Sequence, residues 1–133
     1  MQGYEKISIS NNVMILGTKY NIIKKKYEED EVFKKRGVDG WCSSCKKEIV
    51  YCDASTHPAF ENENDAIELE LYEKEVVRHE IVHAFFSECG LRDSALINNI
   101  ASCKNEELVD WIASMARRIH SAFIEAGVVG INE

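Results

Sequence analysis

The 133-residue sequence contains a single proline, Pro58, and lacks any apolar run of the about 18 residues that a membrane-spanning helix needs. Its first residues also lack the charged start and apolar stretch of a secretory signal. No internal repeat and no low-complexity segment interrupts it. We therefore expect one domain over residues 1–133, located in the cytoplasm and not in a membrane.

Positive charge is scarce as well. The chain has 16 Lys and Arg residues against 23 Asp and Glu residues, which gives a net charge of −7 at pH 7. Surfaces that bind nucleic acids or acidic membranes need clustered Lys and Arg, and the one basic run, at residues 24–26, is followed at once by acidic residues. We expect neither nucleic acid nor membrane as a partner.

The first half of the chain has the pattern of short strands. Alternating apolar and polar residues predict strands at residues 6–10, 13–27, 41–43 and 48–52. Asn11 and Asn12 predict a turn between the first two, and residues 44–47 predict a hairpin turn between the last two. Residues 28–36 are ambiguous, with a short helical turn as one option. We expect a small, mostly antiparallel sheet.

A long helix is predicted after this sheet. Residues 53–64, which include Pro58, are expected to form a loop. Asn64 or Asp65 can cap a helix whose apolar positions continue through Phe86, and Gly90 can end it. With the sheet, this helix predicts an α+β fold.

A second helix is predicted near the end of the chain. Residues 91–101 connect to it, it begins near Ser102 or Asn105, and it stops at Gly127. Its apolar positions follow the helical period, so we expect one face to be buried. These positions are Leu108, Val109, Ile112, Met115, Ala116, Ile119 and Phe123.

The first predicted helix contains the sequence His79-Glu80-x-x-His83. Residues four apart project from the same face of a helix, so the two imidazoles can bind one metal ion. Catalytic Zn²⁺ takes three protein ligands and one water, and Glu80 can act on that water as a general base. The alternative is a buried helix with two hydrogen-bonded histidines. The apolar neighbours make burial plausible, but three polar residues interrupting them together favour the metal site.

A third ligand is expected at the start of the second helix. Glu106 and Asp110 are four residues apart and share a face. Glu106 can bind the metal, and Asp110 can accept the outward N–H of a ligand histidine. The alternative is that these acidic residues only favour the positive end of the helix dipole. That alternative explains Glu107 well and Asp110 less well, because Asp110 lies on the second turn.

The five cysteines offer a separate possibility. Their odd number and the absence of a secretion signal indicate reduced thiols. Cys42, Cys45 and Cys52 with His57 have the composition of a Cys₃His structural zinc site. We favour a hairpin that carries free thiols, because the segment has no second Cys-x-x-Cys.

Together the two helical motifs resemble the gluzincin pattern of thermolysin-like metallopeptidases. In size the chain resembles the minimal gluzincins, which include ImmA/IrrE-type peptidases and small zinc-peptidase-like proteins of phages and prophages of low-GC Gram-positive bacteria. The motifs that carry the resemblance are Ile-Leu-Gly-Thr-Lys-Tyr at 15–20, Asp-Gly-Trp-Cys at 39–42, His-Glu-Ile-Val-His-Ala-Phe at 79–85, and Asn-Glu-Glu-Leu-Val-Asp-Trp-Ile-Ala at 105–113.

The resemblance implies a zincin-like (minigluzincin) fold with one Zn²⁺ per chain. In it, His79, His83 and Glu106 would bind the metal, Glu80 would act as the general base, and Asp110 would orient His79. Thermolysin-like enzymes add a His and a Tyr that stabilise the oxyanion, and we expect no C-terminal domain that would supply them here. By loop position, the nearest candidates for that role are His57, Tyr51 and Tyr72.

Three functions are compatible with these residues. The first is a zinc-dependent peptidase acting on a peptide or protein substrate. The second is a non-catalytic, zinc-stabilised interaction module of phage or prophage origin. The third is a zinc-ribbon-like nucleic-acid binder that uses the cysteines, and the acidic charge disfavours it. Glu80 favours the first over the second, because a structural metal site needs no base beside it.

Overall fold

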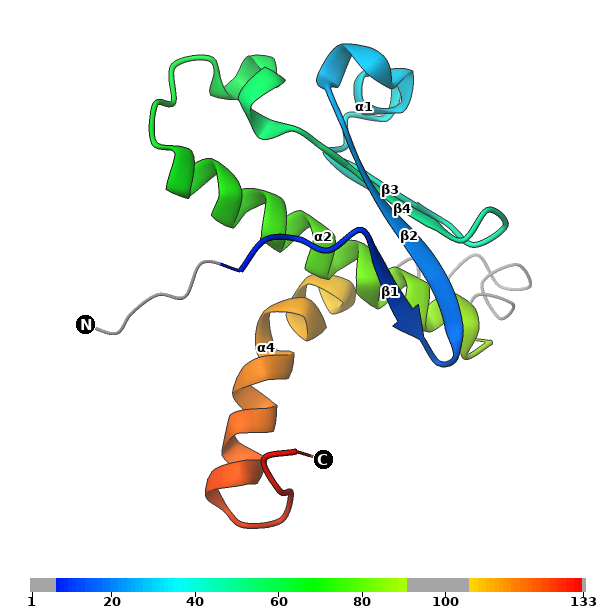
Figure 1. Ribbon diagram of the computed structural model, residues 1–133, viewed down its shortest axis with the longest axis vertical. Coiled ribbons are helices and arrows are strands. Elements are labelled where there is room, and N and C mark those ends of the chain that lie inside the picture. Colours follow the sequence, from blue (N-terminus) through cyan, green and yellow to red (C-terminus); the bar gives the residue numbers. More distant parts are fainter. Residues whose placement is uncertain (1–6, 91–105, 133) are drawn as a thin grey trace.

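A computed structural model describes residues 7–90 and 106–132, and the predictions for Lys6, for residues 91–101 and for a helix start near Ser102 or Asn105 lie outside them. A four-stranded sheet forms the centre of the fold, with helices on both faces (Figure 1). The predicted α+β class is confirmed at this level.

The sheet has the strand order β1, β2, β4, β3. β1 (Asn12–Ile15) pairs antiparallel with β2 (Thr18–Lys25), and β3 (Gly40–Ser43) pairs antiparallel with β4 (Glu48–Cys52). The central pairing of β2 with β4 is parallel, which the strand pattern did not predict. The parallel pairing arises because the β3–β4 hairpin inserts its second strand beside β2.

The prediction of one strand over residues 13–27 was wrong. The chain turns back at Leu16 and Gly17, whose φ angles are 49° and 87°, so the segment forms a hairpin with a two-residue loop. Such loops need positive φ at both positions, and glycine meets this need more easily than leucine. Residues 7–10 are not in a strand, and Asn12 begins β1 instead of lying in a turn.

One face of the sheet packs against α2 (Ala66–Glu88). Side chains alternate along a strand, so every second residue of β2 and β4 reaches this face. The core formed there contains Tyr20 and Ile22 from β2, Ile49 and Tyr51 from β4, and Val77 from α2. This packing fixes which face of α2 points away from the sheet.

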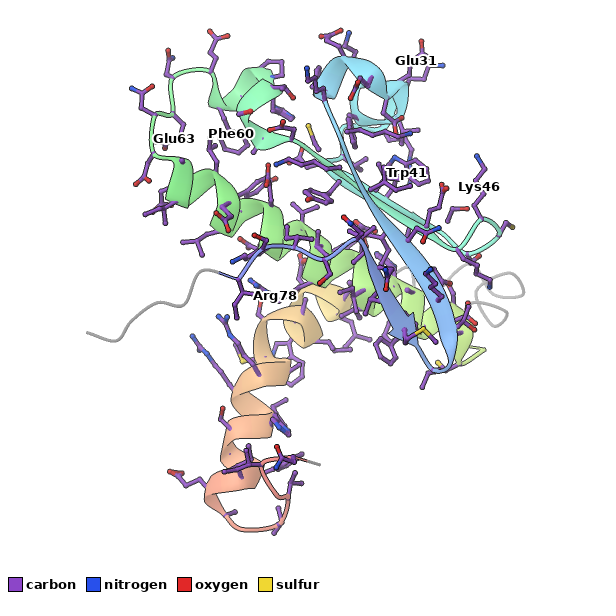
Figure 2. The ribbon with its side chains drawn as sticks, viewed as in Figure 1. Glu31, Trp41, Lys46, Phe60, Glu63 and Arg78 are labelled. Atoms are coloured by element: carbon purple, nitrogen blue, oxygen red, sulfur yellow. The ribbon has the colours of Figure 1, made fainter. Side chains whose placement is uncertain are left out.

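On the opposite face, η1 (Tyr27–Glu29) and α1 (Glu31–Arg36) cover one end of the sheet. Phe33 of α1 packs there against Val50 and Cys52. Trp41 lies on this side as well (Figure 2), where its indole N–H donates to Asp30 Oδ2 over 3.0 Å. The ambiguous segment at 28–36 is therefore helical.

The start and end of α2 agree with the prediction. Residues 53–64 form the expected loop, which contains two short 3-10 turns, η2 (Ala54–Thr56) and η3 (Pro58–Phe60). Asp65 caps the helix by accepting from the backbone N–H groups of its first turn, and Gly90, with φ 90°, follows its end. None of the described helices combines the length and the apolar character needed to cross a membrane.

Two carboxylates anchor α2 to the rest of the fold. The buried Glu73 accepts from the Ala54 backbone N–H over 2.8 Å. Glu88, the last residue of the helix, accepts from Tyr20 Oη over 2.6 Å, from Lys47 Nζ over 2.8 Å and from Thr18 Oγ1 over 3.2 Å. His79, Glu80 and His83 lie on α2 between these two carboxylates.

The last helix, α4 (Glu106–Glu125), starts beside α2 and runs away from the sheet (Figure 1). Its predicted end at Gly127 is confirmed by a C-cap in which Val128 N–H donates to Phe123 O and Gly127 N–H donates to Ile124 O. The predicted burial is wrong for the outer half of α4, residues 116–125. Val109 is buried and Leu108, Ile112 and Met115 are half-buried, whereas Ala116, Ile119 and Phe123 are exposed.

Candidate metal centre

The middle of α2 carries His79, Glu80 and His83. The two histidines are one helical turn apart, and their ring centroids lie 4.9 Å from each other. Their side chains are only 20% and 22% exposed. Both rings therefore lie side by side on the face of α2 that β2 and β4 leave uncovered.

The first turn of α4 brings a carboxylate to these rings. Glu106 Oε1 lies 2.8 Å from His83 Nε2 and 3.3 Å from His79 Nε2. The structure thus places the three residues predicted as metal ligands in one group, although 23 residues separate His83 from Glu106. Both imidazoles present the same nitrogen to one carboxylate oxygen.

This group fits the requirements of Zn²⁺. Its three donor atoms all lie within 4.8 Å of one another, and it is the one group of this kind found in the described residues. A tetrahedral zinc ion with bonds of about 2.0–2.1 Å holds its ligand atoms about 3.3 Å apart. Two imidazole nitrogens and a carboxylate oxygen are also the donor set of many catalytic zinc sites.

Asp110 lies one turn after Glu106 and contacts the other nitrogen of His79. Its Oδ1 is 2.7 Å from His79 Nδ1. The carboxylate can only accept, so His79 donates its Nδ1–H and leaves the Nε2 lone pair directed at Glu106. This is the tautomer and the orientation that a histidine ligand requires.

Glu80 follows His79 on α2 and is 7% exposed. Burial raises its pKa to about 7, and the nearby Glu106 carboxylate adds to the rise, whereas His79 opposes it. Gly40 of β3 lies directly over this part of α2. A Cβ at position 40 would be 2.5 Å from Val76 Cγ1 and 3.4 Å from Glu80 Cγ.

A cleft of about 790 Å³ opens in front of these residues. Its walls are β3 with the turn that follows it, the exposed face of α2, and the first turn of α4. Glu80, His79, His83, Glu106 and Asp110 all line it. The group formed by His79, His83 and Glu106 is therefore open on the side of the cleft.

The three residues predicted as oxyanion stabilisers occupy different places. Tyr72 lines the cleft, but its hydroxyl donates to Asp39, and His57 Nε2 lies 3.0 Å from the same carboxylate. Burial and this hydrogen bond raise the pKa of Tyr72. Tyr51 is buried in the core and lines a separate hollow, so the structure does not bring it to the histidines.

The cysteines do not form a second metal site in the described residues. Cys42 packs against the core on the α2 side of the sheet, whereas Cys52 packs with Phe33 on the opposite side. Burial raises the pKa of the Cys52 thiol to about 11, which keeps it protonated. Cys42 and Cys45 instead line the cleft as reduced cysteines.

Three further charged residues of the cleft were not predicted as site residues. Glu75 lies one turn before His79 on α2, Arg36 ends α1, and Asp39 directly precedes β3. The spacing of four residues between Glu75 and His79 was a signal that could have identified Glu75. No sequence signal marks Arg36. It reaches the cleft because α1 ends close to the start of β3, which forms a wall of the cleft.

In comparisons with known proteins, no protein-family model, no curated protein and no solved structure matches this chain.

Proposed function

We propose that this protein is a zinc-dependent metallopeptidase of the minimal gluzincin type. The observation that carries the proposal is the convergence of His79, His83 and Glu106 in an open cleft, with Glu80 beside them. A metal site that only stabilised the fold would be closed by a fourth protein ligand. Here the fourth side faces the cleft, where a water and a substrate can enter.

Each residue has a defined part in this proposal. Bound zinc would supply a Lewis acid that makes water more acidic and polarises the scissile carbonyl. Glu80 takes the proton of the attacking water and passes it to the leaving amine. Asp110 holds the imidazole of His79 in the orientation that its hydrogen bond defines.

The edge of the sheet supplies a place for an extended substrate. β3 pairs with β4 on one side, and it is the last strand in the order of the sheet. It also forms a wall of the cleft. A peptide that pairs with β3 as an added strand would place its backbone carbonyls above the histidines. The substrate is accordingly a peptide or an extended protein segment.

A second candidate is a non-catalytic, zinc-stabilised interaction module of phage or prophage origin. The observation that favours it is the weak packing of α4, in which Val109 is the one buried side chain among the residues described. A metal held by His79, His83 and Glu106 would tie α4 to α2 and so stabilise the fold. The buried Glu80 and the open cleft have no role in this candidate. We place either function in the cytoplasm, consistent with the reduced state of the described cysteines.

The test is peptide hydrolysis by the zinc-loaded protein and by its Glu80→Gln variant. Gln has nearly the same shape but cannot accept the proton, so zinc content should be retained and hydrolysis of a fluorogenic peptide library should be lost. Glu75→Gln is the matched control, because Glu75 lines the same cleft and has no part in the chemistry. Undiminished hydrolysis by Glu80→Gln would refute the general-base role. Bound zinc without hydrolysis by any of the three proteins would favour the interaction module.

A further inference from the structure

The outer half of α4 has an apolar face that the described residues leave exposed. Ile119 is 37% and Phe123 is 46% exposed, although both belong to the apolar stripe of the helix. The helix points away from the sheet at this end (Figure 1). Large exposed apolar side chains in one stripe are typical of an interaction surface.

The stripe follows a heptad pattern. Ile112, Ile119 and Ala126 are seven residues apart, and Leu108, Met115 and Ala122 form the second row of the same pattern. Such rows form the seam of a two-helix coiled coil. Arg118 and Glu125 lie along one flank of this seam, and neither forms an ion pair with another described residue.

We propose that two copies of this chain associate through antiparallel pairing of the outer halves of their α4 helices. The occupant of the exposed face is thus α4 of a second copy, related by a twofold axis.

The sizes of the side chains fit this pairing. We place the twofold axis of the antiparallel pair at the level between residues 120 and 121. In this register Ile119 faces Ala122 of the second copy, and Met115 faces its Ala126. On one flank, Phe123 lies against Ala116 of the second copy. Each large side chain thereby meets a small one, which is the arrangement that lets two helices interdigitate without a void.

The charges fit the antiparallel direction as well. In the same register Arg118 lies beside Glu125 of the second copy, and the twofold axis repeats this ion pair. A parallel pair would place Arg118 beside Phe123 of the second copy and would leave Glu125 without a cation. Charges on the flank of a seam determine the partner and its direction, so they favour the antiparallel pair.

The shape of the chain leaves room for the second copy. Only the beginning of α4 lies against α2, and the residues after Gly127 are at the far end of the helix (Figure 1). Val128 and Ile131 are 69% and 76% exposed there. The antiparallel register places this end beside Met115 and Ala116 of the second copy, in the middle of its α4.

The experiment is sedimentation equilibrium of the zinc-loaded, full-length protein and of charge variants. Wild type should be a dimer in reversible equilibrium with monomer. Arg118→Glu should weaken the dimer about tenfold, because it replaces two attractive contacts with two repulsive ones. Glu125→Arg should do the same, and the combination Arg118→Glu with Glu125→Arg should restore the wild-type dissociation constant.

Two controls separate this pairing from other associations. Arg117→Glu makes the same charge change outside the seam and should leave the dissociation constant unchanged. Ile119→Glu should yield a monomer with unchanged zinc content and circular dichroism. The proposal is overturned by a wild-type protein that stays monomeric at about 100 μM, which would mean that another segment of the chain covers the face. It is equally overturned by a dimer that none of the Arg118 and Glu125 variants affects.

Discussion

His79 and Asp110 are joined by a 2.7 Å contact between Nδ1 and Oδ1, although 31 residues separate them in the chain. This contact links the middle of α2 to the first turns of α4. It also determines which nitrogen of His79 is left to bind a metal. Asp110, which is not one of the three candidate ligands, therefore orients His79, which is.

The first prediction concerns this contact. Asp110→Asn keeps the volume and the helix but makes His79 a weaker ligand, so zinc affinity should fall about 10- to 100-fold while the protein stays folded in excess metal. The measurement is competition against a chelator of known affinity. Glu107→Gln removes a neighbouring exposed charge from the same turn and should leave the affinity unchanged. If Asp110 were an ordinary surface residue, its replacement would change stability by about 0.5 kcal/mol or less and would not affect zinc.

The second prediction concerns metal content. The purified protein should bind one zinc ion per chain, and changing His79, His83 or Glu106 to Ala should remove it. Cys45→Ser should keep it, because the cysteines do not converge on a second site in the described residues. Elemental analysis after gel filtration measures the ratio. Two zinc ions per chain, with one lost in Cys45→Ser, would contradict this assignment.

The third prediction concerns the contact of β3 with α2. Gly40→Ala places a Cβ 2.5 Å from Val76 Cγ1 and 3.2 Å from the Val50 carbonyl oxygen, so β3 and α2 must separate. Overpacking of this kind should lower the free energy of unfolding by about 1–3 kcal/mol, as measured in urea. Adding Val76→Ala should recover part of the loss, and Val76→Ala alone is the control. A Gly40→Ala protein as stable as wild type would show that β3 and α2 lie farther apart at this position.

The fourth prediction concerns the pH dependence of stability through Glu88. Hydrogen bonds from Lys47 and Tyr20 lower the pKa of Glu88 below its ordinary value of 4.5. A carboxyl group with a lowered folded-state pKa stabilises the fold fully above its unfolded value, and this contribution is lost as the pH falls through the folded value. Glu88→Gln should therefore be less stable than wild type at pH 7.

The difference in stability between Glu88→Gln and wild type should shrink as the pH falls below about 4.5. Thermal unfolding of both at pH 7 and at pH 3 measures it. The exposed Glu61→Gln is the control and should show no such pH-dependent difference. If the difference in melting temperature between Glu88→Gln and wild type is the same at both pH values, the charge of Glu88 is not its cause.

Local patterns predicted those parts of the fold that depend on local interactions. The cap at Asp65, the helical period and the glycine at position 90 bounded α2 correctly, because each acts within one or two turns of the chain. The hairpin at Leu16 and Gly17 was missed, because Leu-Gly is not among the usual pairs for a two-residue loop. The parallel pairing of β2 with β4 was missed as well, because no local pattern specifies which distant strand becomes a neighbour.

The sequence by itself determined that His79 and His83 share one face of a helix, because that follows from a spacing of four residues. Only the tertiary structure decided that Glu106 reaches both rings, since the packing of α4 on α2 sets that distance. It also decided that Tyr51 is buried away from the cleft. Period-two alternation places Tyr51 and Ile49 on one face of β4, but the pairing of the strands and the docking of α2 determine that this face forms the core.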